Sequence, residues 1–183
     1  MRIIATIGLL LALGGSSLAV DANKTREMEL DKLFGNLHQA SAATQHTKIE
    51  QDIWSLWASN DSPTAELLLR QAVAAMNAHE YDASEKTLIQ LVETYPNFAE
   101  GWNKRATLYF MQGRNDASLI DIEHVLELEP RHFGALAGKA MILRAQGKNL
   151  DALKVLRETR SINPYMESVL QAIKDLEKAN PDI

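Results

Sequence analysis

Apolar side chains recur at helical spacing along most of the chain, and the pattern predicts units of two amphipathic helices. The clearest unit spans 99–130, where apolar or small residues stand at Trp102, Ala106, Tyr109, Ser118, Ile122 and Val125. Spacings of three, four and seven residues place such side chains on one face of a helix. Gly113 separates the two helices, because glycine readily adopts the left-handed conformation that ends a helix. Pro130 ends the second helix, since the residue before a proline is pushed out of helical geometry.

The same unit recurs on both sides of this stretch. Pro96, Pro130 and Pro164 are 34 residues apart each time, so we expect repeats at 65–98, 99–132 and 133–166. A fixed period of this length is typical of helical repeat arrays. The eighth and twentieth positions of the repeats share small side chains, which let two helices approach closely. These residues are Ala72, Ala106, Ala140, Ser84, Ser118 and Ala152.

These motifs resemble tetratricopeptide repeats (TPR), strongly in the second repeat, well in the third and weakly in the first, where His79 replaces the turn glycine. The resemblance covers Ala65 to Met166 and implies an all-α fold, a right-handed α-α superhelix of three repeats. It also implies a capping helix at 165–179, which completes a TPR domain at 63–180. One departure recurs at position seven, usually leucine, which holds Gln71, Arg105 and Lys139. A polar group there must find a partner or reach solvent, and a structural ladder is favoured over a functional stripe.

The segment before the repeats predicts a hairpin of two amphipathic helices, over roughly 25–40 and 42–59. This hairpin does not follow the 34-residue template, and terminal units of repeat arrays are commonly atypical because one face has no neighbour. We interpret residues 20–62 as an N-terminal cap that packs against the first repeat. Trp54 and Trp57 have an alternative interpretation as a partner-binding patch. Core packing is favoured, because large aromatic side chains bury much apolar area.

The first nineteen residues have the pattern of a secretory signal peptide. Arg2 precedes an apolar run at 3–13, and Ser17, Leu18 and Ala19 form a site for cleavage after Ala19. The run is too short to cross a bilayer, which takes roughly 20 residues. We therefore expect a cleaved signal peptide at 1–19 and a periplasmic protein. An uncleaved membrane anchor is the alternative.

Composition narrows the function classes further. The formal net charge of −5 disfavours nucleic acid as a partner, because affinity for phosphates comes largely from Lys and Arg. The chain has no cysteine, which excludes disulfides, thiolate metal sites and cysteine nucleophiles. Its five histidines lack zinc-binding spacing, and neither a phosphate-cradling glycine loop nor a Gly-x-Ser-x-Gly motif occurs. We expect no enzyme activity, no metal, no cofactor and no small-molecule substrate.

The TPR resemblance implies a concave groove lined by the first helix of each repeat. The groove positions of the family carry over to Arg70, Val73, Met76, Asn77, Asn103, Lys104, Thr107, Phe110, Met111, Met141 and Arg144. The apolar members offer adaptable packing, and the others offer hydrogen bonds and positive charge. Glu66, Glu100 and Gly134 at position two do not fit the two-carboxylate clamp of some chaperone-binding TPR domains, so that interpretation is rejected. The alternative for the apolar members is packing against neighbouring repeats or the N-terminal hairpin.

The leading hypothesis is a non-enzymatic protein–protein interaction module that binds a partner peptide or helix in the groove. The second hypothesis is an assembly scaffold for a cell-envelope complex in division, outer-membrane or cytochrome biogenesis. Such a scaffold would use the outer face or the N-terminal helices, and it rests on fold-level analogy. Self-association is a further alternative, in which residues 20–47 of another copy fill the groove. The sequence does not identify the partner.

Overall fold

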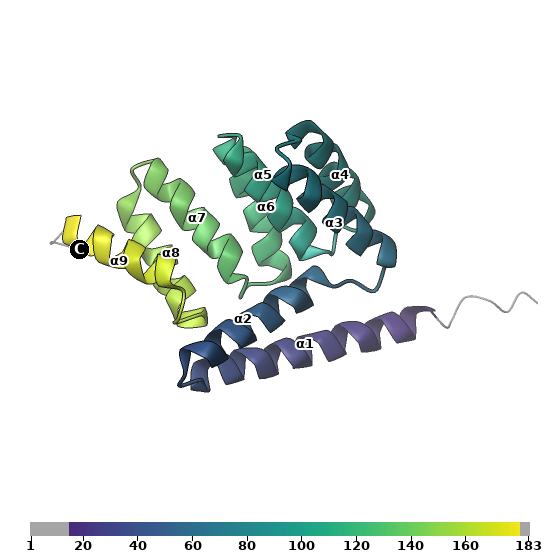
Figure 1. Cartoon of the computed structure of the whole chain (residues 1–183), viewed down its shortest axis with the longest axis horizontal. Helices are drawn as coiled ribbons and strands as arrows, with labels where there is room; N and C mark the ends of the chain where they lie inside the picture. Colours follow the sequence, from purple (N-terminus) through teal and green to yellow (C-terminus); the bar gives the residue numbers. More distant parts are fainter. Residues whose placement is uncertain (1–14, 180–183) are drawn as a thin grey trace, which may run out of the picture.

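The computed structural model describes residues 15–179, with side chains from residue 24 onward. Over this range the chain forms helices and no strands. The helices are α1 (Gly15–Gln39), α2 (Ala43–Ala58), α3 (Pro63–Asn77), α4 (Tyr81–Thr94), α5 (Ala99–Met111), α6 (Asn115–Leu128), α7 (Phe133–Ala145), α8 (Asn149–Ile162) and α9 (Glu167–Ala179). Helices α3 to α8 pack as three consecutive pairs, and α9 follows the last pair (Figure 1). This arrangement confirms the predicted all-α TPR superhelix.

The two helices of a repeat meet at the small residues of positions eight and twenty. Ser84 Oγ donates a hydrogen bond to the carbonyl oxygen of Ala72 at 2.9 Å, and Ser118 Oγ donates to that of Ala106 at 2.8 Å. Both serines are buried, so each hydroxyl needs this acceptor to offset its loss of water. The small side chains therefore allow close approach, and the hydroxyl groups also link the two helices directly.

The turn inside each repeat uses a left-handed backbone. Gly113 and Gly147 have φ values of 75° and 73°, and His79 holds the equivalent place in the first repeat with φ of 60°. A side chain in this conformation costs roughly 1–2 kcal/mol. His79 Nδ1 lies 2.9 Å from the Tyr81 hydroxyl, a contact that glycine could not make. The first repeat thus keeps the turn geometry of the other two without their glycine.

Two of the three polar residues at position seven pair with second helices, as a structural ladder requires. Arg105 on α5 makes two hydrogen bonds of 2.7 Å to the buried Asp121 on α6, and this carboxylate raises the pKa of the guanidinium. Lys139 on α7 lies 2.6 Å from Glu123 on α6, a more exposed pair that joins adjacent repeats. Gln71 on α3 is exposed to solvent.

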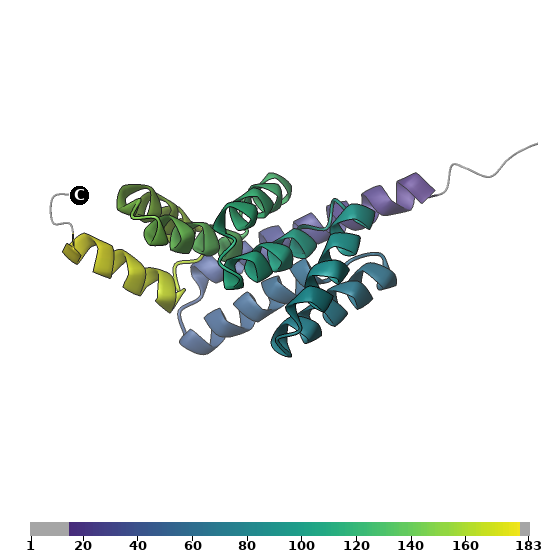
Figure 2. The same ribbon diagram turned by 90° about the horizontal axis from the view of Figure 1, so that it is seen from above.

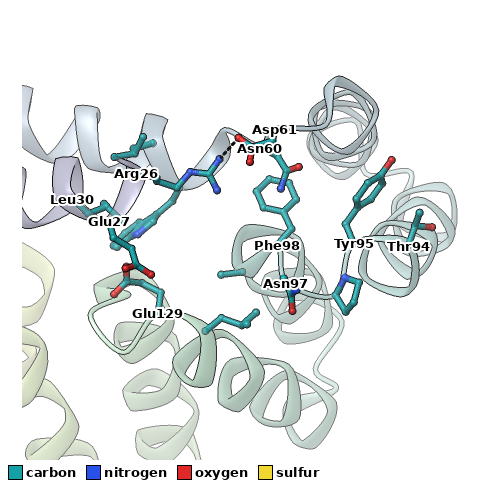
Figure 3. A pocket seen from close by; sticks show the side chains of 15 residues that line it. Arg26, Glu27, Leu30, Asn60, Asp61, Thr94, Tyr95, Asn97, Phe98 and Glu129 are labelled. Carbon is teal, nitrogen blue, oxygen red and sulfur yellow. Dashed lines mark ion pairs between the residues drawn. The ribbon is translucent and has the colours of Figure 1, made fainter. Parts of the chain in front are cut away.

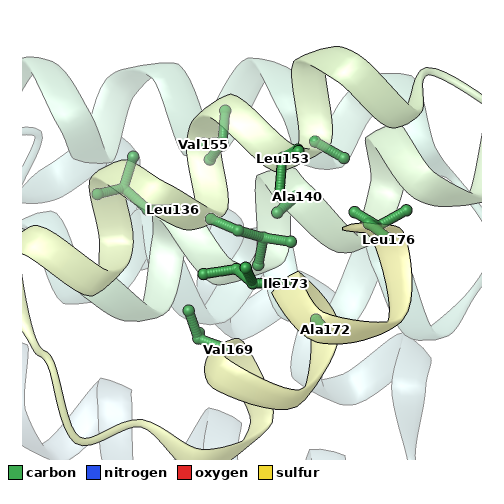
Figure 4. Close-up of a cluster of buried hydrophobic side chains, with 10 residues drawn as sticks. Leu136, Ala140, Leu153, Val155, Val169, Ala172, Ile173 and Leu176 are labelled. Atoms are coloured by element: carbon green, nitrogen blue, oxygen red, sulfur yellow. The ribbon is translucent and has the colours of Figure 1, made fainter. Parts of the chain in front are cut away.

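Helix α9 covers the apolar face that the third repeat leaves open. Its Val169, Ala172, Ile173 and Leu176 are buried against α7 and α8 (Figure 4). The opposite face of α9 carries exposed charged residues such as Lys174 and Glu177. An apolar face toward the array and a polar face toward water are what a terminal helix of a solenoid needs.

The N-terminal hairpin lies elsewhere than the predicted cap. Helix α1 begins at Gly15 rather than near Thr25, and α1 with α2 runs along the loop side of the repeats instead of stacking on the first one (Figures 1 and 2). The hairpin contributes Leu30, Phe34, Leu37, Ile53 and Trp57 to a buried cluster with Phe133, the first residue of α7. The two tryptophans therefore serve packing, but chiefly against the third repeat.

Polar contacts hold the far end of the hairpin to the loop between α8 and α9. The Tyr165 hydroxyl donates to the Ala40 carbonyl oxygen at 3.0 Å, and its ring stacks on His46. Asn163 Nδ2 donates to Glu50 at 3.2 Å. The hairpin thus braces the third repeat and the start of α9.

Most of the expected signal peptide, residues 1–14, lies outside the described range. Between residues 15 and 179, no helix combines the length and the apolar character needed to cross a membrane.

Candidate partner-binding groove

A continuous groove follows the inner face of the array from α5 to α9. A cavity of about 330 Å³ between α5 and α7 is lined by Asn103, Thr107, Phe110, Gly134, Ala137, Gly138 and Met141, among others. A second, wider opening toward α9 is lined by Phe110, Met141, Arg144, Asn149, Asp175 and Leu176, among others. Phe110 and Met141 line both, so the two form one surface, which we name the open groove.

The structure brings five of the predicted groove residues together. Asn103, Thr107, Phe110, Met141 and Arg144 all line the open groove, and the Met141 side chain is 52 % exposed. Small residues form part of the wall on α7, so a partner's chain could approach its backbone closely. The open groove therefore combines apolar side chains at its centre with charged side chains near α9.

The other predicted groove residues lie outside the open groove. Met76 is buried, and both it and Val73 pack in the core of the first repeat. Arg70 pairs with Glu66 at 3.4 Å, while Asn77 and Met111 are exposed. The alternative of packing within the array therefore describes Met76 and Val73, and in part Phe110, which packs against a buried cluster shared by the second and third repeats. It does not describe the exposed Met141 and Met111.

The hairpin occupies the other end of the concave face. The Trp54 ring packs so closely on Gly134 that an added Cβ there would lie 2.4 Å from Trp54 Cη2. Lys104 Nζ lies 5.5 Å from the Trp54 ring centroid and 2.7 Å from Glu100 Oε1. Lys104, expected to contact a partner, is therefore engaged within the chain. The one sequence signal of this contact is Gly134 itself, which stands where the first two repeats have glutamate.

Glu100 is the centre of a buried polar cluster beneath the hairpin. Its carboxylate accepts hydrogen bonds from Asn103 Nδ2 at 2.9 Å and from His132 Nε2 at 3.1 Å. His132 Nδ1 accepts from the backbone N–H of Ala135, so the proton of the imidazole is on Nε2. Burial by itself raises the pKa of Glu100, but His132 and the charge of Lys104 outweigh it and lower that pKa. The sequence pattern did not indicate this cluster, because His132 lies 32 residues after Glu100, at the opposite end of the second repeat.

The cluster is not arranged for catalysis. Glu100 and His132 are almost fully buried, and His132 is covered by Trp57, whose ring stacks on it with centroids 4.0 Å apart. A substrate could not reach either group without displacing the hairpin. Within the described part of the chain, no three His, Asp or Glu side chains gather as a metal ion would require. The cluster instead joins the second repeat, the third repeat and the hairpin.

Stacked helix pairs with a groove on their inner face define a helical-repeat solenoid, and comparison with known proteins identifies the family. The family model described as tetratricopeptide repeat matches residues 69–123. A TPR repeat-containing protein of Rhizobium etli is 36 % identical over 144 residues, which are 79 % of this chain and 71 % of that protein. The chain belongs to the tetratricopeptide repeat family.

Solved structures with the same fold include TPR domains bound to peptides or chaperones. The first TPR of Spaghetti (RPAP3), bound to an HSP90 peptide, matches with a TM-score of 0.62 and 16 % identity, over 67 % of this chain and 97 % of that one. The TPR2B domain of yeast Sti1, in a pHsp70 complex, matches with a TM-score of 0.60 and 17 % identity, over 65 % and 100 % of the two chains. At these identities the likeness shows the fold alone.

Proposed function

We propose that this chain binds a segment of a partner protein, an extended peptide or a helix, in the open groove. The observation that carries the proposal is the continuity of the groove through Phe110 and Met141, two apolar side chains that line both of its parts. The peptide complexes of proteins with the same fold support it. An apolar anchor of the partner would enter the cavity between α5 and α7, and its polar flanks would meet Arg144 and Asp175.

Site-specific photo-crosslinking in the native host tests this proposal. A photo-reactive residue at Met141 should capture a partner, whereas one at Met28 should not, because Met28 is 64 % exposed on α1, away from the groove. The Ala137→Phe substitution, which fills the cavity, should abolish capture while circular dichroism remains unchanged. Equal capture from the two positions, or capture that survives the filled cavity, would contradict the groove assignment.

We further propose that residues 1–19 direct export to the periplasm and are then removed. The support is the order of Arg2, the apolar run at 3–13 and the small residues up to Ala19. The intact mass of the protein from osmotic-shock fluid of the native host tests both points. A cytoplasmic protein that keeps Arg2 would contradict them.

A further inference from the structure

The open groove has a methionine at the junction of its two parts. Met141 lines both parts, and the residue is 52 % exposed. A methionine sulfur that solvent can reach is open to oxidants, which convert the thioether into a polar sulfoxide. Met76 is only 6 % exposed and packs in the core of the first repeat, so it is a protected comparison within the same chain. Met141 therefore combines access for an oxidant with a place in the proposed binding surface.

Arg144 lies three residues after Met141 on α7 and lines the same opening. Side chains at this spacing are neighbours on a helix surface, so the guanidinium can reach an oxygen atom on the Met141 sulfur. Arg144 is exposed, and no ion pair or hydrogen bond joins its side chain to another described residue. Asp175, which lines the opening as well, accepts a hydrogen bond from Gln171 Nε2 at 2.7 Å. The Arg144 guanidinium is thus available to a new acceptor.

A larger cavity, of about 650 Å³ where the hairpin meets the first two repeats, differs in this respect (Figure 3). Its Arg26 lies 3.6 Å from Asp61, an ion pair that Figure 3 marks with a dashed line. Glu129, also in its lining, lies 3.1 Å from Arg131. Of these two cavities, the open groove is therefore the one whose arginine has no partner among the described residues.

Oxidation of Met141 changes the polarity at the centre of the groove. A sulfoxide oxygen placed against an apolar side chain of a partner loses its hydrogen bonds with water, which costs free energy. Arg144 can donate a hydrogen bond to this oxygen, and a bond from a charged donor is stronger than one between neutral groups. Such a bond holds the guanidinium at Met141, where the two parts of the groove join.

We propose that Met141 is a site of reversible oxidation, and that its sulfoxide, held by Arg144, closes the open groove to a partner. The oxidant is hydrogen peroxide, which transfers one oxygen atom to Met141 Sδ. A sulfur lone pair forms the S–O bond, the O–O bond breaks and water leaves, so the sulfur loses the two electrons that the peroxide gains. A thiol-dependent sulfoxide reductase reverses the step, since two thiols become a disulfide and the oxygen leaves as water.

The effect on partner binding rests on the function proposed above, whereas the oxidation and the contact with Arg144 do not. Limited treatment of the purified full chain with hydrogen peroxide tests these two points. Mass spectrometry of its peptides should find Met141 oxidised at least about tenfold faster than Met76. Nuclear magnetic resonance should show a downfield shift of the Arg144 Nε–H signal in the oxidised wild type, but not in oxidised Met141→Leu. Equal oxidation rates, or an Arg144 signal that does not respond, would overturn the proposal.

Photo-crosslinking in the native host tests the effect on binding, with the photo-reactive residue at Thr107, an exposed position in the open groove. The measured quantity is capture after a peroxide pulse, relative to capture by the same untreated variant. This ratio should fall at least about tenfold in the wild type and change less than about twofold in Met141→Leu, because leucine has no sulfur.

Met111→Leu is the matched control, because Met111 is 47 % exposed on α5 but does not line the open groove. This variant should lose capture after the pulse as the wild type does. Equal loss in Met141→Leu and the wild type, or capture that survives the pulse in both, would overturn the proposal. If Thr107 captured nothing even without peroxide, the function proposed for the groove would be contradicted instead.

Discussion

Alanine is expected to have opposite effects at two glycines that lie one turn apart on α7. At Gly134 an added Cβ would lie 2.4 Å from Trp54 Cη2, closer than carbon atoms can approach, and 3.1 Å from Cζ2, a tight contact. At Gly138 its nearest neighbour would be Ile122 Cδ1 at 3.6 Å, an ordinary van der Waals contact. Neither glycine has a positive φ, so alanine suits the backbone at both positions. The difference between the variants therefore isolates the contact with the hairpin.

The expected magnitudes follow from these distances. Replacing glycine by alanine in a helix raises the free energy of unfolding by about 1 kcal/mol, which Gly138→Ala should gain almost fully. At Gly134 the Trp54 ring must move, and overpacking of this kind costs about 1–3 kcal/mol. The ring also packs edge-on against Phe133 and His132, at 5.3 and 5.5 Å between centroids, so it cannot shift alone. The net effect of Gly134→Ala should therefore be to lower the free energy of unfolding by about 0–2 kcal/mol. Relative to Gly138→Ala, the free energy of unfolding should be lower by about 1–3 kcal/mol.

Urea unfolding followed by circular dichroism measures both free energies. A double-mutant cycle adds Trp54→Leu, which removes the ring that the new methyl group would contact. Gly134→Ala should become favourable in that background, with a coupling energy of at least about 1 kcal/mol. Gly138→Ala should have the same effect with or without Trp54.

Equal stabilisation by the two alanines would refute this reasoning. The reasoning would also be refuted if the free-energy changes of Gly134→Ala and Trp54→Leu were additive within about 0.5 kcal/mol in the double mutant. Either result would mean that Trp54 does not rest on Gly134. The end of the concave face near Lys104 would then be open to a partner, and the open groove would be longer than described.

Three further predictions concern the framework of the repeats. Because the pKa of Glu100 is lowered on folding, its contribution to stability is complete above the ordinary value of 4.5 and is lost as the pH falls through the lower folded value. The unfolding free energy should thus fall more steeply below pH 4.5 in the wild type than in Glu100→Gln, as urea titrations across the acid range can measure. Asp121→Ala leaves Arg105 unpaired in a partly buried place and should lower the free energy of unfolding by about 3–5 kcal/mol. Lys139→Ala breaks a more exposed pair and should lower it by less than about 1 kcal/mol. Chemical denaturation of the two variants measures both changes. His79→Gly should raise the thermal unfolding midpoint, because the removal of about 1–2 kcal/mol of left-handed backbone strain outweighs the loss of one exposed hydrogen bond. An unchanged or lower midpoint would contradict this prediction.

Part of the candidate groove could be predicted from the sequence. Template positions identified Phe110, Met141 and Arg144, which do line the open groove, because every repeat presents the same face of its first helix. The same template placed Met76 and Lys104 there as well. It could not account for the burial of Met76 in the core of the first repeat, or for the buried Glu100 that engages Lys104.

The sequence by itself determined the pairs of helices, their turns and their order, because each depends on contacts within one repeat or between neighbours. Such contacts recur every 34 residues and are visible as the spacing of Pro96, Pro130 and Pro164. Only the tertiary structure decided where the hairpin lies and which part of the concave face stays open. Those outcomes depend on single contacts between distant residues, such as Trp54 on Gly134 and Tyr165 on Ala40, and contacts made once leave no periodic signal.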